Sequence, residues 1–193
     1  MQAKEVLLLL TDQFADWEAS YAISGINLVP QYTVKTIAVD GRPKVSMGGL
    51  RTEVDYTIED YHNFENLAMF ILPGGFVWQK GRHDNIAAFV RKAREANIPI
   101  AAICGATIFL GKHGLLDEIK HTGDELELFQ KADGYGGESC YVAAQVVVDG
   151  GIITANETAA IEFAHAIFRT LKIHADEDID AWCDYFRNGM VNK

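Results

Sequence analysis

The stretch that decides the fold runs from Asn97 to Leu116 and reads NIPIAAICGATIFLGKHGLL. The apolar run Ile98 to Ile103 predicts a buried strand, with its proline near the start, where no ladder donor is needed. Cys104 follows, then two small residues and an apolar segment that ends near Gly114, a typical helix stop. A side chain at such a tight strand-to-helix turn is lifted out of the sheet, as in the nucleophile elbow of hydrolases.

Cys104 is therefore the central functional candidate, and two interpretations of it stay open. The free N–H groups and the dipole of a helix N-terminus stabilise negative charge, which favours a reactive thiolate. Free cysteine is also one of the most buried residue types, so that Cys104 can equally be a structural thiol. The strand–Cys–Gly–Ala–helix context supports the nucleophile about as strongly as the burial preference of cysteine supports the structural thiol.

Composition narrows the class of protein. The 193 residues suit one α/β domain, here taken as 1–193. The formal net charge of -10 argues against a nucleic-acid-binding surface. The N-terminal apolar run is too short for a signal peptide or a membrane span, which predicts a cytoplasmic protein without a membrane partner.

Metal and cofactor signals are missing from the sequence. The three cysteines, Cys104, Cys140 and Cys183, are widely spaced and form no Cys-x-x-Cys pair. The six histidines include no His-Glu-x-x-His motif. The sequence predicts no disulfide framework, no metal site and no cofactor.

The rest of the chain alternates strand and helix signals, which predicts an α/β fold with a mostly parallel sheet. Val6 to Leu10 lacks polar alternation, as expected of a strand covered on both faces. Expected strands are 5–10, 32–39, 67–72, 98–103, 144–148 and 152–154, with a hairpin excursion at 45–54. Expected helices are about 15–28, 58–61, 85–96, 125–131, 159–171 and 179–186.

Three further positions join Cys104 as site candidates. Glu18 follows the first strand, and ligands of open α/β sheets lie outside the carboxyl ends of the strands. Its carboxyl group is therefore a candidate proton relay at the ligand site, and the alternative is a charge on the surface. Pro73-Gly74-Gly75 ends another strand and is either a simple turn or half of an oxyanion hole. His121 is the candidate base, or a surface histidine. Asp124 is expected to cap the following helix.

The motifs in this order and spacing resemble the DJ-1/PfpI superfamily, over nearly the whole chain. They are Leu10-Thr11-Asp12 with Asp16-Trp17-Glu18, Leu72-Pro73-Gly74-Gly75, Ala102-Ile103-Cys104-Gly105-Ala106-Thr107 and Asp149-Gly150-Gly151-Ile152-Ile153-Thr154-Ala155. The resemblance is to bacterial glutamine-amidotransferase-like and intracellular-protease-like members. It implies a flavodoxin-like three-layer sandwich with a reactive cysteine on an elbow, and a homodimer.

Carried over by position, the resemblance assigns Cys104 as nucleophile, Glu18 as its hydrogen-bonded carboxyl group, and Gly75 and Gly105 as oxyanion-hole amides. Two positions depart from well-known branches. Gly105 stands where PfpI-type proteases place a histidine, and His165 lacks the His-x-Glu pair of glutamine amidotransferases. Other relatives place a histidine in the loop after the elbow helix, about where His121 lies.

Several functions fit this constellation. The first is an enzyme acting on a small carbonyl or amide substrate, as a hydrolase, an amidotransferase-like transferase or a glyoxalase-like lyase. The second is a cysteine-based redox sensor or stress-protective protein without turnover, because an exposed low-pKa thiol oxidises readily. The third is an interaction protein that keeps the elbow without using it.

Overall fold

The computed structural model describes residues 2–190 of the chain. The strands are β1 (Lys4–Leu9), β2 (Tyr32–Ala38), β3 (Lys44–Val45), β4 (Arg51–Thr52), β5 (Tyr56–Thr57), β6 (Leu67–Leu72), β7 (Ile100–Ile103), β8 (Val146–Asp149) and β9 (Ile152–Ala155). The α-helices are α1 (Asp16–Asn27), α2 (Asp84–Glu95), α3 (Gly105–Lys112), α4 (Leu126–Gln130), α5 (Ala160–Leu171) and α6 (Asp176–Asn188). Short 3-10 helices are η1 (Phe64–Asn66), η2 (Phe76–Gln79) and η3 (Glu138–Cys140).

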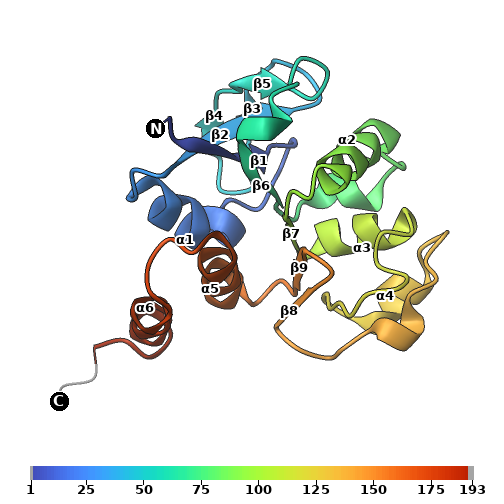
Figure 1. Ribbon diagram of the computed structural model, residues 1–193. Coiled ribbons are helices and arrows are strands. Elements are labelled where there is room, and N and C mark those ends of the chain that lie inside the picture. Colours follow the sequence, from blue (N-terminus) through green and yellow to red (C-terminus); the bar gives the residue numbers. More distant parts are fainter. Residues whose placement is uncertain (1, 191–193) are drawn as a thin grey trace.

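A seven-stranded sheet forms the middle layer, in the order β5-β2-β1-β6-β7-β9-β8. All neighbouring strands pair parallel except β8, which pairs antiparallel with β9. Helices α1, α5 and α6 lie on one side of the sheet, and α2 and α3 lie on the other (Figure 1). This is the flavodoxin-like α/β sandwich that the sequence predicts.

Strand order decides where a ligand site can form. From β1 the chain moves outward to β2, and later returns to the other side of β1 with β6, β7 and β9. The strand order therefore reverses between β1 and β6, and ligands of such sheets bind outside the carboxyl ends of the strands at this point. The loops that follow β1, β6 and β7 meet there.

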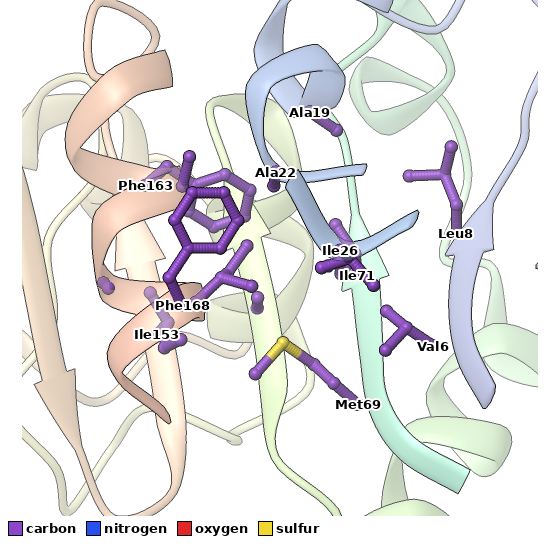
Figure 2. Close-up of a cluster of buried hydrophobic side chains, with 14 of the residues drawn as sticks. Val6, Leu8, Ala19, Ala22, Ile26, Met69, Ile71, Ile153, Phe163 and Phe168 are labelled. Carbon is purple, nitrogen blue, oxygen red and sulfur yellow. The ribbon is translucent and has the colours of Figure 1, made fainter. Parts of the chain in front are cut away.

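Two hydrophobic cores cover the two faces of the sheet. Alternate residues of a strand point to opposite faces, so Val6 and Leu8 of β1 enter the core under α1 and α5, while Leu7 and Leu9 enter the core under α2 and α3. Figure 2 shows the first core, in which Phe163 and Phe168 of α5 pack beside the α1 side chains.

Most expected elements are confirmed to within a few residues, and one is wrong. The sequence predicts a helix over 58–61, but the chain forms strand β5 just before it and then a turn. Tyr56 and Tyr61 both donate to the Glu5 carboxylate, at 2.8 and 2.9 Å, and this holds the segment against the edge of the sheet. Among residues 2–190, every helix is too short or too polar to cross a bilayer.

Gly25 of α1 is expected to be needed for the close packing of α1 on α5. A Cβ at this position would overlap the tip of the Phe168 ring. Gly25→Ala is therefore expected to lower the free energy of unfolding by about 1–3 kcal/mol, despite the better helix propensity of alanine. Urea denaturation measures the change, and Gly41→Ala, with its nearest neighbour at 3.8 Å, is the matched control. The overlap is established if the Gly25→Ala substitution lowers the free energy of unfolding less in a Phe168→Leu background than in the wild type. It is contradicted if the losses of the two single variants add in full in the double variant.

Candidate functional site

Cys104 lies at the joint between β7 and α3, in a backbone conformation that non-glycine residues rarely adopt. Its φ and ψ are 57° and -134°. Its N–H donates to the Ala155 carbonyl at 2.9 Å, and its own carbonyl accepts from Thr107 N at 2.9 Å. These bonds hold the turn in place. The conformation costs about 1–3 kcal/mol, and such strain persists where the surrounding structure enforces it, often at functional sites.

Glu18 meets the cysteine from α1. Its carboxyl group is 1% exposed, accepts the Gly74 N–H at 2.6 Å and hydrogen-bonds the Cys104 thiol. Gly74 makes this approach possible, because a Cβ there would lie within 2.8 Å of both the Glu18 carboxylate oxygens and the Cys104 Cβ. The loops after β1, β6 and β7 thus bring together a carboxyl group, an amide and a sulfur.

Burial controls the protonation of this pair. It raises the pKa of Glu18 to about 7, against a smaller opposing effect of the hydrogen bonds from Gly74 and Cys104. Burial also raises the pKa of the Cys104 thiol, and the carboxylates of Glu18 and Asp124 raise it further, while the Gly105 N–H lowers it. Burial and the two carboxylates thus outweigh the stabilisation of a thiolate by the N-terminus of α3. At neutral pH the sulfur is therefore a thiol, beside a carboxyl group whose pKa is near neutral.

Asp124 and Glu157 complete the surroundings of the sulfur. Cys104 Sγ and one oxygen from each of these two carboxylates lie within 4.8 Å of one another. The Asp124 carboxylate lies beside the thiol and accepts the Glu157 N–H at 2.7 Å. The expected role of Asp124 as a helix cap is wrong, because α4 begins after Glu125 without a side-chain cap. Within residues 2–190, Cys104, Asp124 and Glu157 are the side chains whose spacing suits a metal ion, and such an ion would take Sγ as a ligand.

Hydrogen bonds of Thr122 hold the loop that carries Asp124 beside β9. Thr122 N donates to Thr154 Oγ1 at 2.9 Å, and Thr122 Oγ1 donates to the Ala144 carbonyl at 2.7 Å. Both threonines are buried. Strand β9 is the direct neighbour of β7, so the loop brings Asp124 to the carboxyl end of the strand that carries Cys104.

His121 lies elsewhere, in the interior of an aromatic cluster. It is fully buried, and its two ring nitrogens are engaged by the Ile119 carbonyl at 2.8 Å and the Tyr135 hydroxyl at 2.7 Å. The rings of Phe129, Tyr135 and Tyr141 surround it. Burial lowers the pKa of His121, which favours the neutral imidazole. The structure does not bring His121 to the cavity that contains Cys104.

A cavity of about 750 Å³ opens above the sulfur. Its apolar wall consists of Trp17, Met47, Phe76, Trp78, Ile108 and Leu128. Trp78 is buried and fixed by its indole N–H, which donates to the Pro73 carbonyl at 2.9 Å. Met47 belongs to the β3–β4 hairpin, and its N–H donates to the Phe14 carbonyl at 2.9 Å. The cavity suits a small molecule with an apolar part.

Gly75 and Gly105 both line this cavity. The Gly105 N–H donates to the Cys104 sulfur at the start of α3. A Cβ on Gly105 would lie 3.3 Å from the Trp78 ring and 3.6 Å from the Gly75 carbonyl oxygen, so the two glycines lie close to each other beside the sulfur.

The raised pKa of Glu18 is expected to make stability depend on pH. Between about pH 4.5 and 7 the folded protein keeps a proton that the unfolded chain releases, so the free energy of unfolding falls as pH rises. The fall is up to about 3 kcal/mol. Glu18→Gln is expected to lack this component in urea denaturation at pH 5, 6, 7 and 8, whereas the exposed Glu53→Gln keeps it. Identical pH profiles for wild type and Glu18→Gln would contradict the assignment.

The backbone strain at Cys104 is expected to appear in a pair of variants that both lack the sulfur. Glycine adopts positive φ without steric cost, and alanine does not. Cys104→Gly is therefore expected to be more stable than Cys104→Ala by about 1 kcal/mol, although glycine is normally the less stable of the two. Thermal or urea denaturation measures the difference, and an alanine variant at least as stable as the glycine variant would refute the strain.

Comparison with known proteins identifies the family of this chain. The DJ-1/PfpI family model matches residues 4–170. The chain is 38% identical to "Uncharacterized protease YdeA" of Bacillus subtilis, over 98% of this chain and all of that protein. It is 30% identical to "Uncharacterized protease YoaZ" of the same organism, over 94% of this chain and 90% of that protein.

Solved structures give the same result. A thiJ/pfpI family protein from Bacillus anthracis superposes with a TM-score of 0.90 at 29% identity, covering 98% of this chain and 93% of that one. The DJ-1 superfamily protein Atu0886 from Agrobacterium tumefaciens superposes with a TM-score of 0.87 at 29% identity, covering 95% and 97%. The chain therefore belongs to the DJ-1/PfpI family.

Proposed function

We propose that this protein is a cysteine-dependent hydrolase or acyl-transfer enzyme that acts on a small carbonyl or amide substrate. The observation that carries the proposal is the buried Glu18 carboxyl group, with a pKa of about 7, hydrogen-bonded to the thiol of the strained elbow residue Cys104. A general base works best when its pKa lies near the operating pH.

The chemistry follows from these positions. Glu18 takes the thiol proton as Sγ bonds to the carbonyl carbon, and the carbonyl π electrons move to the oxygen. The Gly75 and Gly105 amides donate to that oxyanion, because the Gly105 N–H is released from the sulfur once the S–C bond forms. The oxyanion then collapses, the bond to the leaving group breaks, and Glu18 returns the proton to it. Water then attacks the thioester carbonyl carbon while Glu18 takes a proton from it, the S–C bond breaks, the carboxylic acid product leaves, and Glu18 returns the proton to Sγ.

Asp124 acts in this scheme as a positioning residue. Its carboxylate lies beside the sulfur on the β9 side, opposite to Glu18 on the β1 side. The protease names of the two Bacillus subtilis relatives support cleavage of an acyl bond. The size of the cavity supports a small substrate, and an amidotransferase-like transfer differs only in the acceptor that replaces water.

The redox-sensor alternative has less physical support. Peroxide oxidises the thiolate, and a sensor cysteine needs a low pKa and access to solvent. Here burial and two carboxylates raise the thiol pKa. A base that removes the proton only when substrate is bound is better suited to turnover than to stoichiometric oxidation. The homodimer and the cytoplasmic location remain predictions. The assisting role of His121 has no support from the geometry, because both of its ring nitrogens are engaged by Ile119 and Tyr135.

Matched cysteine variants test the proposal. Purified protein is incubated with p-nitroanilides and p-nitrophenyl esters of small acyl groups, and the acyl-enzyme is sought by intact-mass spectrometry. Cys104→Ser is expected to lower turnover by at least about 1,000-fold, and Glu18→Gln by about 100- to 10,000-fold. Cys140→Ser, at a half-buried thiol outside the cavity, is the control and should keep wild-type turnover.

Two results would overturn the proposed hydrolysis. One is turnover that survives in Cys104→Ser. The other is a wild-type protein that forms no adduct on Cys104 with any activated ester while its fold is intact by circular dichroism.

A further inference from the structure

The charges around Cys104 point to a class of substrate. We propose that the cavity selects carbonyl compounds that carry a positive charge, such as an ammonium or guanidinium group, a few bonds from the reacting carbon. This inference rests on the proposed function, because it names which substrates the same nucleophile receives.

The acidic groups at the sulfur have no cationic partner in the part of the chain that the structure describes. Glu18, Asp124 and Glu157 all line the cavity, and within residues 2–190 no Lys, Arg or His nitrogen lies within 4.0 Å of their carboxylates. Lys112 also lines the cavity, but its Nζ donates to the Trp78 carbonyl at 3.2 Å. Lys131 lies at the exposed rim.

The carboxylates are placed where a substituent of a bound carbonyl compound would lie. Oxygens of Asp124 and Glu157 are within 4.8 Å of Sγ and of each other. A carbonyl carbon bonded to Sγ therefore lies close to both carboxylates, and so do its nearby substituents. A cation there gains attraction from both, whereas an anion is repelled.

The rim above the carboxylates is aromatic. Trp17 is 52% exposed and Phe76 is 53% exposed, although both line the cavity. Large exposed aromatic rings beside an acidic floor suit a protonated amine, because ring faces attract cations. Glu157 is also exposed, so its charge is met by a substrate as it enters.

A bound cation would also promote the reaction itself. The Asp124 carboxylate opposes ionisation of the thiol, and neutralising it favours the thiolate. Substrate charge and nucleophile activation are thereby coupled, so that the sulfur ionises mainly when a fitting substrate is present.

Charged thiol reagents of similar size test this selection without requiring turnover. The probes are 2-aminoethyl methanethiosulfonate, a cation, and 2-sulfonatoethyl methanethiosulfonate, an anion. In each reaction Sγ bonds to the sulfenyl sulfur, the S–S bond of the reagent breaks, methanesulfinate leaves, and the thiol proton passes to Glu18 or solvent. Rates at Cys104 are read by peptide mass spectrometry and divided by the rates with 2-mercaptoethanol.

After this correction, Cys104 is expected to react with the cationic reagent on the order of 100-fold faster than with the anionic reagent. This ratio of rates should decrease as salt is added. Glu157→Gln should lower the ratio about 10-fold. The control is Glu177→Gln on α6, an exposed position outside the cavity, which should leave the ratio unchanged.

The outcomes separate this inference from the proposed function. A corrected ratio within about 3-fold of unity, or a high ratio that is unchanged in Glu157→Gln, would overturn the charge selection. A folded protein in which Cys104 reacts with neither reagent would overturn both proposals. A high ratio that depends on Glu157, in a protein without turnover, would support the charge selection and overturn only the hydrolysis.

Discussion

The contact between the Glu18 carboxyl group and the Cys104 sulfur is the constraint on which the rest of the site depends. A carboxyl group that is 1% exposed beside a thiol cannot ionise as it does in water, so the two groups compete for a proton. Gly74 is required because any side chain there would separate them. The strained backbone of Cys104 is required because a relaxed strand end would keep the sulfur in the sheet.

The sequence is sufficient to predict the sheet and its helices, for a physical reason. Strands such as 67–72 and helices such as 85–96 carry strong apolar patterns, because the helices that connect parallel strands bury both faces of the sheet. The prediction for the segment 58–61 is wrong because local propensity favours a short helix there. Two tyrosine hydroxyls instead bind the carboxylate of Glu5, which lies more than fifty residues away in sequence. A contact of that kind leaves no local pattern.

Part of the site is predictable for the same reason. Cys104, Glu18, Gly75 and Gly105 occupy strand ends and helix starts, and the topology brings all of them to one edge of the sheet. Asp124 and Glu157 lie in loops whose course depends on Thr122 and Thr154, a buried pair with no sequence signature. His121 is a plausible base by residue type, but its two nitrogens are already satisfied by Ile119 and Tyr135.

A cysteine nucleophile usually has a histidine as its base, and a carboxyl group can replace it only when burial shifts its pKa. Glu18, with a pKa near 7, meets this condition. With a carboxyl group as the base, negative charge surrounds the sulfur and raises the pKa of the thiol, so that the thiol stays protonated in the absence of substrate. A histidine would have supplied a positive charge when protonated. In its absence the compensating charge has to come with the substrate, so an acidic base next to the nucleophile and a preference for cationic substrates have the same electrostatic cause.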